Sequence, residues 1–147
     1  MRKRKVICLM LVAAILLSLS TNTHAYAQSI YVKEGEAIEP HYDHTMSTGS
    51  GVTFIDGIAY LYGSVSGYQN RTTQINGFLY LQHKVGSDWF IVKTWTGSVK
   101  DWTLDISGEA TGLSSGTYRT RFVTYVYEGS ESEEVIYISK EVVYNKK

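Results

Sequence analysis

The sequence predicts an all-β protein, an antiparallel β-sandwich of about seven strands. From Val52 onward, short runs of Tyr, Val, Ile, Thr and Phe recur about every 10–15 residues, separated by Gly, Ser, Asn and Asp. Beyond the first 27 residues, no segment shows the sustained periodicity of an amphipathic helix. The chain length suits one hydrophobic core rather than two.

The first 27 residues have the layout of a secretory signal peptide. Met1–Lys5 is basic, Val6–Leu19 is almost wholly apolar, and Ala25-Tyr26-Ala27 offers small side chains for cleavage. The apolar run is shorter than the roughly 20 residues of a membrane-spanning helix; a retained membrane anchor is the alternative. Cleavage after Ala27 would leave 120 of the 147 residues as a secreted, extracellular protein.

Removal of this segment changes the charge balance. Four of the 14 basic residues lie within Met1–Lys5, so the secreted chain keeps 10 positive and 14 negative side chains, a net charge of −4. That balance argues against a nucleic-acid partner and against attraction to anionic membranes. The single cysteine, Cys8, leaves as well, so no disulfide, thiol nucleophile or zinc–thiolate site is expected.

Residues 28–51 differ in composition from the rest of the secreted chain and predict a flexible, extended polar arm. The arm contains the polar run Lys33-Glu34-Gly35-Glu36 and the only proline, Pro40. Met46–Gly51 consists mainly of small residues. One short strand is expected near Ile30–Val32.

The β-sandwich domain is expected to span residues 52–147. The apolar runs place its strands near residues 52–55, 58–67, 74–83, 89–95, 99–107, 118–127 and 135–144. Asp56-Gly57 and Gly86-Ser87-Asp88 are tight-turn sequences, and Glu128–Glu133 predicts a charged loop tip.

Alternation along the strands assigns their faces. In residues 74–83 one face carries Ile75, Leu79 and Leu81. The other carries Asn76, Phe78, Tyr80 and Gln82. In residues 118–127 the core side carries Tyr118, Phe122 and Val126, and the two arginines mark the other face as the solvent side.

The run Leu113-Ser114-Ser115-Gly116-Thr117-Tyr118 resembles the tyrosine corner of immunoglobulin-like and fibronectin-type sandwiches. In those folds the tyrosine hydroxyl bonds to the backbone a few residues upstream and holds the crossover between the sheets. The resemblance implies an immunoglobulin-like sandwich. An ordinary turn followed by a strand that contains a tyrosine is the alternative.

A second resemblance rests on Leu79-Tyr80-Leu81-Gln82, on Trp89, and on Gly116-x-Tyr118-Arg119-x-Arg121 in this order. The chain resembles a family of small uncharacterised secreted proteins of Gram-positive bacteria with an immunoglobulin/fibronectin-like β-sandwich. The resemblance covers roughly residues 58–143 and implies the sandwich and secretion. It transfers no catalytic or binding residue.

Metal and catalytic chemistry have few candidates. His41, Asp43 and His44, with His83 farther along, could in principle ligate zinc or copper. They lack helical spacing, however, and a polar arm with two histidines is the preferred interpretation, so no metal and no cofactor are expected.

Catalytic constellations are equally sparse. The chain has no Gly-x-Ser-x-Gly elbow. Asp101 and Asp105 share a strand face, but a small sandwich offers little cleft between them. Glu131, Glu133 and Glu134 are expected on a solvated loop tip. The sequence therefore predicts a protein that is not an enzyme.

An aromatic sheet face is the most function-like feature. If strands 74–83, 118–127 and 135–144 are neighbours, their outward residues form one surface, which would bind a cell-wall polysaccharide or an extracellular protein. Its predicted residues are Phe78, Tyr80, Tyr125, Tyr127 and Tyr137, rimmed by Arg119 and Arg121. Three alternatives stay open: the strand preference of tyrosine, coverage by the arm, and a dimer contact.

A secreted, non-catalytic binding module for cell-envelope glycan or a protein is thus the leading hypothesis. A bacteriocin-like antagonist is the second, although such proteins are often cationic. A small secreted hydrolase, which would need clustered acids in a pocket, is the third.

Overall fold

The computed structural model describes residues 42–147, so the predicted signal peptide and the short strand expected near Ile30–Val32 lie outside the described residues. The described part of the chain contains no helix, and its eight strands are β1 (Thr45–Ile55), β2 (Ile58–Gly67), β3 (Gln74–Val85), β4 (Asp88–Val99), β5 (Thr103–Ala110), β6 (Gly116–Glu128), β7 (Glu131–Ile138) and β8 (Val142–Tyr144). In particular, no helix among residues 42–147 has the length and hydrophobicity needed to cross a membrane.

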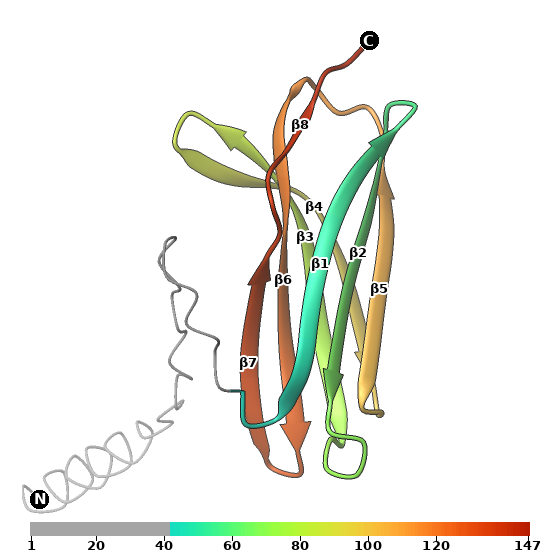
Figure 1. The fold of residues 1–147 in the computed structure, drawn as a ribbon, viewed down its shortest axis with the longest axis vertical. Helices are drawn as coiled ribbons and strands as arrows, with labels where there is room; N and C mark the ends of the chain where they lie inside the picture. Colours follow the sequence, from blue (N-terminus) through green and yellow to red (C-terminus); the bar gives the residue numbers. More distant parts are fainter. Residues whose placement is uncertain (1–41) are drawn as a thin grey trace, which may run out of the picture.

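The strands form two antiparallel sheets that pack face to face (Figure 1). One sheet has the order β1-β2-β5 and the other the order β4-β3-β6-β7, with β8 paired to the first residues of β6. The predicted all-β class with two antiparallel sheets is confirmed.

Alternating apolar residues on the inner faces of the two sheets form one hydrophobic core. On β3, Ile75, Leu79 and Leu81 are fully buried, as the alternation predicts. On β6, Phe122 and Val126 are equally buried. The facing sheet contributes Leu61, Val65, Leu104 and Ile106.

Strand β1 begins earlier than the sequence predicts. It starts at Thr45, so Met46–Gly51 forms part of a strand rather than the end of an arm. Small side chains suit this position, because Ser50 is buried with its hydroxyl 2.7 Å from that of Thr120. Gly51 lies against the Tyr62 ring, where a β-carbon would be only 2.7 Å from a ring carbon. The boundary expected at Val52 is therefore wrong.

The segment expected as one strand over residues 99–107 contains a turn. Strand β4 ends at Val99, and the Asp101 carboxylate accepts a hydrogen bond of 2.7 Å from the Trp102 amide before β5 begins. The chain crosses from one sheet to the other in this turn. Aspartate is suited to such turns because its short side chain bonds to the nearby backbone.

The segment expected as one strand over residues 135–144 is divided into β7 and β8. At Ser139 the backbone amide donates to the Thr120 carbonyl at 3.0 Å, while the Ser139 hydroxyl accepts from the Thr120 amide at 2.9 Å. A side chain thus replaces one backbone partner and interrupts the ladder. The predicted loop tip before β7 is a tight turn, with Gly129 at a φ of 63°.

The distal half of the β3–β4 hairpin projects sideways from the body of the sandwich (Figure 1). A β-bulge between Leu81 and Gln82 interrupts the pairing of the two strands. Bulges bend and twist a strand, and beyond this one Val85, Phe90 and Ile91 are more than half exposed. The hairpin therefore extends one sheet past the edge of the core.

Candidate binding surface

The residues predicted for the aromatic surface come mainly from β3 and β6. These strands pair antiparallel, with Phe78 opposite Val123 and Tyr80 opposite Arg121. Opposed residues in such a pair point to the same side of the sheet. We call the solvent side of the β4-β3-β6-β7 sheet the outer face. It carries six of the seven predicted residues: Phe78, Tyr80, Arg119, Arg121, Tyr125 and Tyr127.

Tyr137, the seventh, lies on the other side of the sheet. On β7 it is opposite Phe122, whose ring is in the core. It is 37 % exposed because β7 is an edge strand. Alternation could not assign its face, since Val135-Ile136-Tyr137-Ile138 is apolar at every position. The prediction that Tyr137 joins the outer face is therefore wrong, and Ile136 and Ile138 occupy the outward positions of β7.

The aromatic rings at the centre of the outer face are not coplanar. The Phe78 and Tyr125 rings have centroids 6.3 Å apart and an interplanar angle of 86°. Val123 lies between Phe78 and Ile136 in the sheet and is only 5 % exposed. These side chains therefore form an uneven apolar surface that presents both the edges and the faces of rings, rather than a flat platform.

The end of the outer face nearest the β6–β7 turn is polar. Tyr125 donates a hydrogen bond of 2.7 Å to the Glu134 carboxylate. This bond, helped by burial, raises the pKa of Tyr125 to about 12, so the phenol stays neutral. Nearby, the Asn76 side chain lies 3.5 Å from the Tyr127 hydroxyl and accepts from Ser98 at 2.7 Å.

At the opposite end, nearest the β3–β4 turn, arginines lie over aromatic rings. The Arg119 guanidinium carbon is 4.0 Å from the Trp89 ring centroid, and Lys84 Nζ is 5.4 Å from it. Arg119 also donates to the Gln82 side chain at 2.9 Å. Arg121 lies 5.9 Å from the Tyr80 ring centroid. Contacts of this kind contribute roughly 0.5–2 kcal/mol each and fix the orientation of the rings.

Trp89 is the outer-face residue that sequence reasoning missed. It is placed by the tight β3–β4 turn, which pairs it with Lys84. The turn sequence Gly86-Ser87-Asp88 could have predicted this position. A two-residue hairpin turn fixes which residues of the two strands are opposite each other, and it places Trp89 opposite Lys84.

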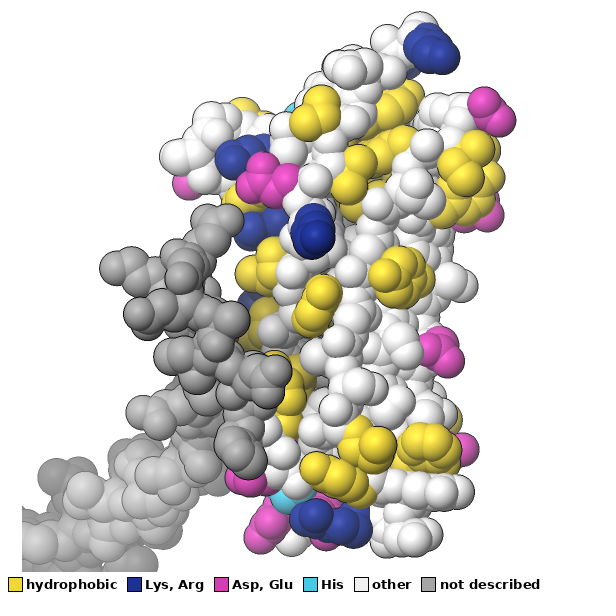
Figure 2. Space-filling view, in the orientation of Figure 1, with side chains coloured by type: hydrophobic (Ala, Val, Ile, Leu, Met, Phe, Trp, Pro, Cys, Tyr) yellow, Lys and Arg dark blue, Asp and Glu magenta, His cyan; other side chains and the backbone are white. Residues whose placement is uncertain are grey.

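The opposite side of the sandwich has a different character. Over β1, β2 and β5 the visible surface in Figure 2 is mostly small polar side chains and backbone, with separate hydrophobic side chains. Tyr62 is 59 % exposed there. On the outer face, by contrast, Phe78, Tyr80 and Tyr125 occupy neighbouring positions of two paired strands.

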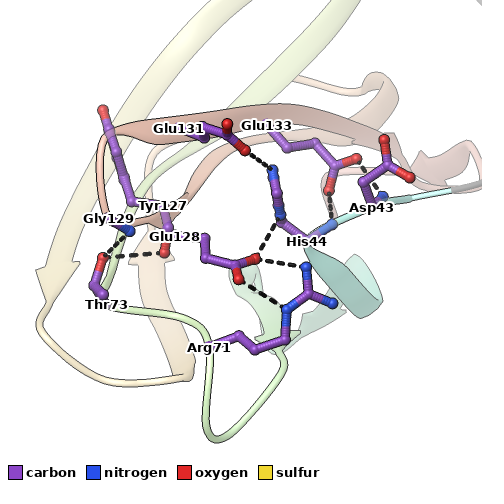
Figure 3. A network of polar contacts seen from close by, with 9 residues as sticks. All are labelled: Asp43, His44, Arg71, Thr73, Tyr127, Glu128, Gly129, Glu131 and Glu133. Carbon is purple, nitrogen blue, oxygen red and sulfur yellow. Dashed lines mark hydrogen bonds and ion pairs between the residues drawn. The ribbon is translucent and has the colours of Figure 1, made fainter.

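The residues weighed as metal ligands are separated. His44 Nδ1 contacts Glu128 at 3.0 Å, and the Glu133 carboxylate accepts from the Asp43 and His44 amides (Figure 3). His83 lies elsewhere, stacked on Tyr118 with centroids 4.6 Å apart. His41 lies outside the described residues. Among residues 42–147, no three potential ligands are arranged to hold a metal ion.

Glu128 is the centre of this charged network. Arg71 binds it with two hydrogen bonds, of 2.9 Å and 2.7 Å, and these lower the pKa of Glu128 from its usual value of 4.5. The network connects the residues before β1, the loop after β2 and the β6–β7 turn (Figure 3). It holds the first described residues against the start of β7.

The pairing of Glu128 predicts a loss of stability in acid. A carboxyl group whose pKa is lowered by folding stabilises the fold above its usual pKa and loses this effect as the pH falls through the folded value. Arg71→Gln should therefore lower the melting temperature at neutral pH and have no effect once Glu128 is protonated. Melting curves from pH 7 to pH 2 test this, with Lys100→Gln as the control. A difference that persists below the pKa would contradict the assignment.

The candidate catalytic acids do not converge. Asp101 lies in the turn before β5, whereas Asp105 is exposed on β5 itself. Glu134 is bonded to Tyr125, and Glu133 to backbone amides. Within residues 42–147, Asp101, Asp105 and Glu134 thus lie apart, and only Glu131 and Glu133 meet, at the imidazole and the backbone amide of His44.

Comparison with known proteins identified no relative whose function could suggest a ligand for this surface. No family model, curated protein or solved structure matches the chain.

Proposed function

We propose that this protein is a secreted, non-catalytic binding module that recognises an extracellular protein through its outer face. The observation that carries the proposal is the grouping of Phe78, Tyr80, Tyr125 and Arg121 on the solvent side of one sheet. Tyr, Trp, Phe and Arg are the residues enriched at the centres of protein interfaces. Secretion rests on the sequence of residues 1–27.

A protein partner fits this face better than a polysaccharide. A sugar polymer stacks on rings that present their flat sides together, whereas the Phe78 and Tyr125 rings are nearly perpendicular. The tyrosine and arginine side chains offer both apolar area and hydrogen bonds at little entropic cost, because their contacts already hold them.

We further propose an immunoglobulin/fibronectin-like topology for the sandwich. The order β1-β2-β5 against β4-β3-β6-β7 corresponds to strands A-B-E against C′-C-F-G of such folds. The hydrogen bond of 2.8 Å from the Tyr118 hydroxyl to the Ser114 carbonyl supports a tyrosine corner.

Replacing both Tyr80 and Tyr125 with serine should abolish binding to the producing cells. Because neither side chain belongs to the core, the variant should stay folded, although the loss of the Tyr125–Glu134 hydrogen bond and of the Arg121–Tyr80 contact should lower the free energy of unfolding by about 1–3 kcal/mol. Binding of the labelled secreted chain to intact cells, before and after protease treatment of those cells, measures the effect. Tyr60→Ser with Tyr62→Ser, on the other sheet, is the matched control.

The outcomes separate the possibilities. Binding that protease treatment of the cells and the Tyr80/Tyr125 change both remove supports the proposal. Binding that survives the protease identifies a glycan ligand instead, and binding retained by the stable double variant excludes the outer face.

A further inference from the structure

The distal half of β4 is an exposed edge strand. Within residues 42–147, β4 pairs only with β3, and beyond the bulge the hairpin projects from the body of the sandwich (Figure 1). Phe90, Ile91 and Val92 are all exposed there. Soluble proteins usually protect such edges with charged residues, with proline or with an overlying segment. The run Trp89–Val92 contains neither a charge nor a proline, so this edge is open to pairing with another strand.

The β3–β4 turn determines which backbone groups face the open edge. Val85 pairs with Asp88 across the two-residue turn. The residues that flank such a turn are hydrogen-bonded to each other, and along the strands hydrogen-bonded pairs alternate with non-hydrogen-bonded ones. Trp89 and Ile91 therefore occupy non-hydrogen-bonded positions opposite β3. Their amide and carbonyl groups point to the open edge, whereas those of Phe90 point toward β3.

This alternation favours one register for an antiparallel pair of β4 strands from two molecules. Because the two kinds of pair alternate, the two-fold axis lies where one residue is opposite its own copy. With Phe90 at the axis, Trp89 of each molecule is opposite Ile91 of the other, and their outward backbone groups meet. Centring the axis on Ile91 would instead place Trp89 opposite Lys93, which the bulge shifts to a position bonded to β3.

The side chains match in the same register. Phe90 is opposite His83, so its ring is on the core side of the sheet. The two Phe90 rings meet at the axis, where the strands approach most closely. Ile91 is opposite Gln82, so on the outer side each Ile91 packs against Trp89 of the other copy. Pairs of aromatic residues, and pairs of an aromatic with a β-branched residue, are favoured between neighbouring strands.

The charges at the two ends of the paired segment are complementary. Asp88 is on the core side, and among the described residues no cation lies within ion-pair distance of it. In this register Asp88 of one copy is opposite Val92 of the other, next to Lys93. Lys93 is also on the core side, opposite Leu81, and uses one of its three N–H groups for the Glu109 carbonyl. Two symmetric Asp88–Lys93 ion pairs can therefore form.

We propose that this edge is the contact between two copies of the chain, which pair their β4 strands antiparallel about an axis at Phe90. The two β4-β3-β6-β7 sheets then become one continuous sheet. A two-fold axis perpendicular to a sheet keeps both outer faces on the same side, so the dimer presents two outer faces together. Only the consequence of this arrangement, bivalent binding of a partner, rests on the proposed function.

A single cysteine tests the position of the axis. The secreted chain would have no other cysteine, because Cys8 lies in the predicted signal peptide. In the proposed register the two Cα atoms of residue 90 are about 4.5 Å apart, within the range of a disulfide, whereas those of residue 92 are about 14 Å apart. Phe90→Cys should therefore form a disulfide-linked dimer about tenfold faster than Val92→Cys under mild oxidation. Equal rates would overturn the proposal.

A proline at the open edge tests the pairing itself. The Ile91 amide points away from β3, so Ile91→Pro removes only the donor used between copies. Thr96→Pro is the matched control, because Thr96 is opposite Phe78 at an equivalent edge position outside the paired segment. Equal melting temperatures for the two variants exclude unfolding as the cause.

Sedimentation velocity measures the effect of the two prolines. The contact involves only residues 88–92 of each strand, and interfaces smaller than about 1,200 Å² give weak association. The wild-type chain and Thr96→Pro should therefore be monomers at about 1 µM and form dimers as the concentration approaches about 1 mM. Ile91→Pro should weaken the dimer about tenfold or more, because the central hydrogen bonds are lost.

The outcomes separate this proposal from the proposed function. A chain that is monomeric at every concentration overturns the dimer, while the Tyr80 and Tyr125 variant still decides partner binding. A dimer that survives Ile91→Pro but is lost without Tyr80 and Tyr125 would place the second copy on the outer face instead. Loss of cell binding in Ile91→Pro, at concentrations where the wild-type chain is monomeric, would assign the edge to a protein partner. A β4 dimer that binds no cell supports the inference and refutes the function.

Discussion

Phe122→Ala should lower the free energy of unfolding by about 3–5 kcal/mol, the largest effect expected of a single substitution in this fold. The Phe122 ring is fully buried between the two sheets. It fits there because Gly63 and Gly77 have no side chains: a β-carbon at Gly63 would lie 2.9 Å from the ring. Alanine would leave a cavity against two glycines, which have no side chains to fill it.

The same packing predicts that two damaging changes partly compensate. Gly63→Ala alone should cost about 1–3 kcal/mol, because the ring must move. Combined with Phe122→Ala, the added methyl enters vacant space, so the double variant should be more stable than the sum of the single changes predicts. Urea unfolding of the four proteins measures the coupling. Strict additivity would mean that residue 63 and the ring do not contact each other.

Tyr118→Phe should lower the free energy of unfolding by about 1–2 kcal/mol, because the Ser114 carbonyl loses its buried donor. The ring contacts would remain: Tyr118 stacks on His83 and lies 5.3 Å from Phe54. Only the hydroxyl is tested by this change.

Tyr144→Phe is the matched control for that substitution. Tyr144 belongs to the same aromatic cluster, stacked on Phe54 with centroids 4.4 Å apart. Its hydroxyl has no hydrogen bond to another residue of the described chain. The same chemical change should therefore cost little at Tyr144, and equal denaturation midpoints for the two variants would show that the Ser114 contact contributes nothing.

The alternation of side chains made much of the fold predictable. It assigned the faces of β3 correctly, because a strand with one face in the core must alternate, but Gln82 on the outer side is only 7 % exposed and bonds to Arg119. The Leu-x-x-Gly-x-Tyr run predicted the bond of the Tyr118 hydroxyl to the upstream backbone, which is confirmed. Both signals are local, so they need no knowledge of distant partners.

Features that depend on pairing between strands were not predictable in the same way. The face of Tyr137 depends on the register of β7 with β6, which the uniformly apolar run around it does not encode. The early start of β1 depends on close contacts, of Ser50 with Thr120 and of Gly51 with Tyr62, that exist only when the sheets meet. Trp89 joins the candidate site only through its pairing with Lys84.

The strand order also has a consequence for how the protein must fold. Strand β5 completes the first sheet, yet it follows β3 and β4 of the second sheet in the chain, and β6 and β7 follow β5. The local hairpins β1–β2, β3–β4 and β6–β7 close short loops and can form early, whereas β2–β5 and β3–β6 must close long ones. Neither sheet can be finished before most of the other has been synthesised. We therefore expect the two sheets to fold as a single cooperative unit, with the slowest step being the one at which β5 and β6 join the hairpins that precede them.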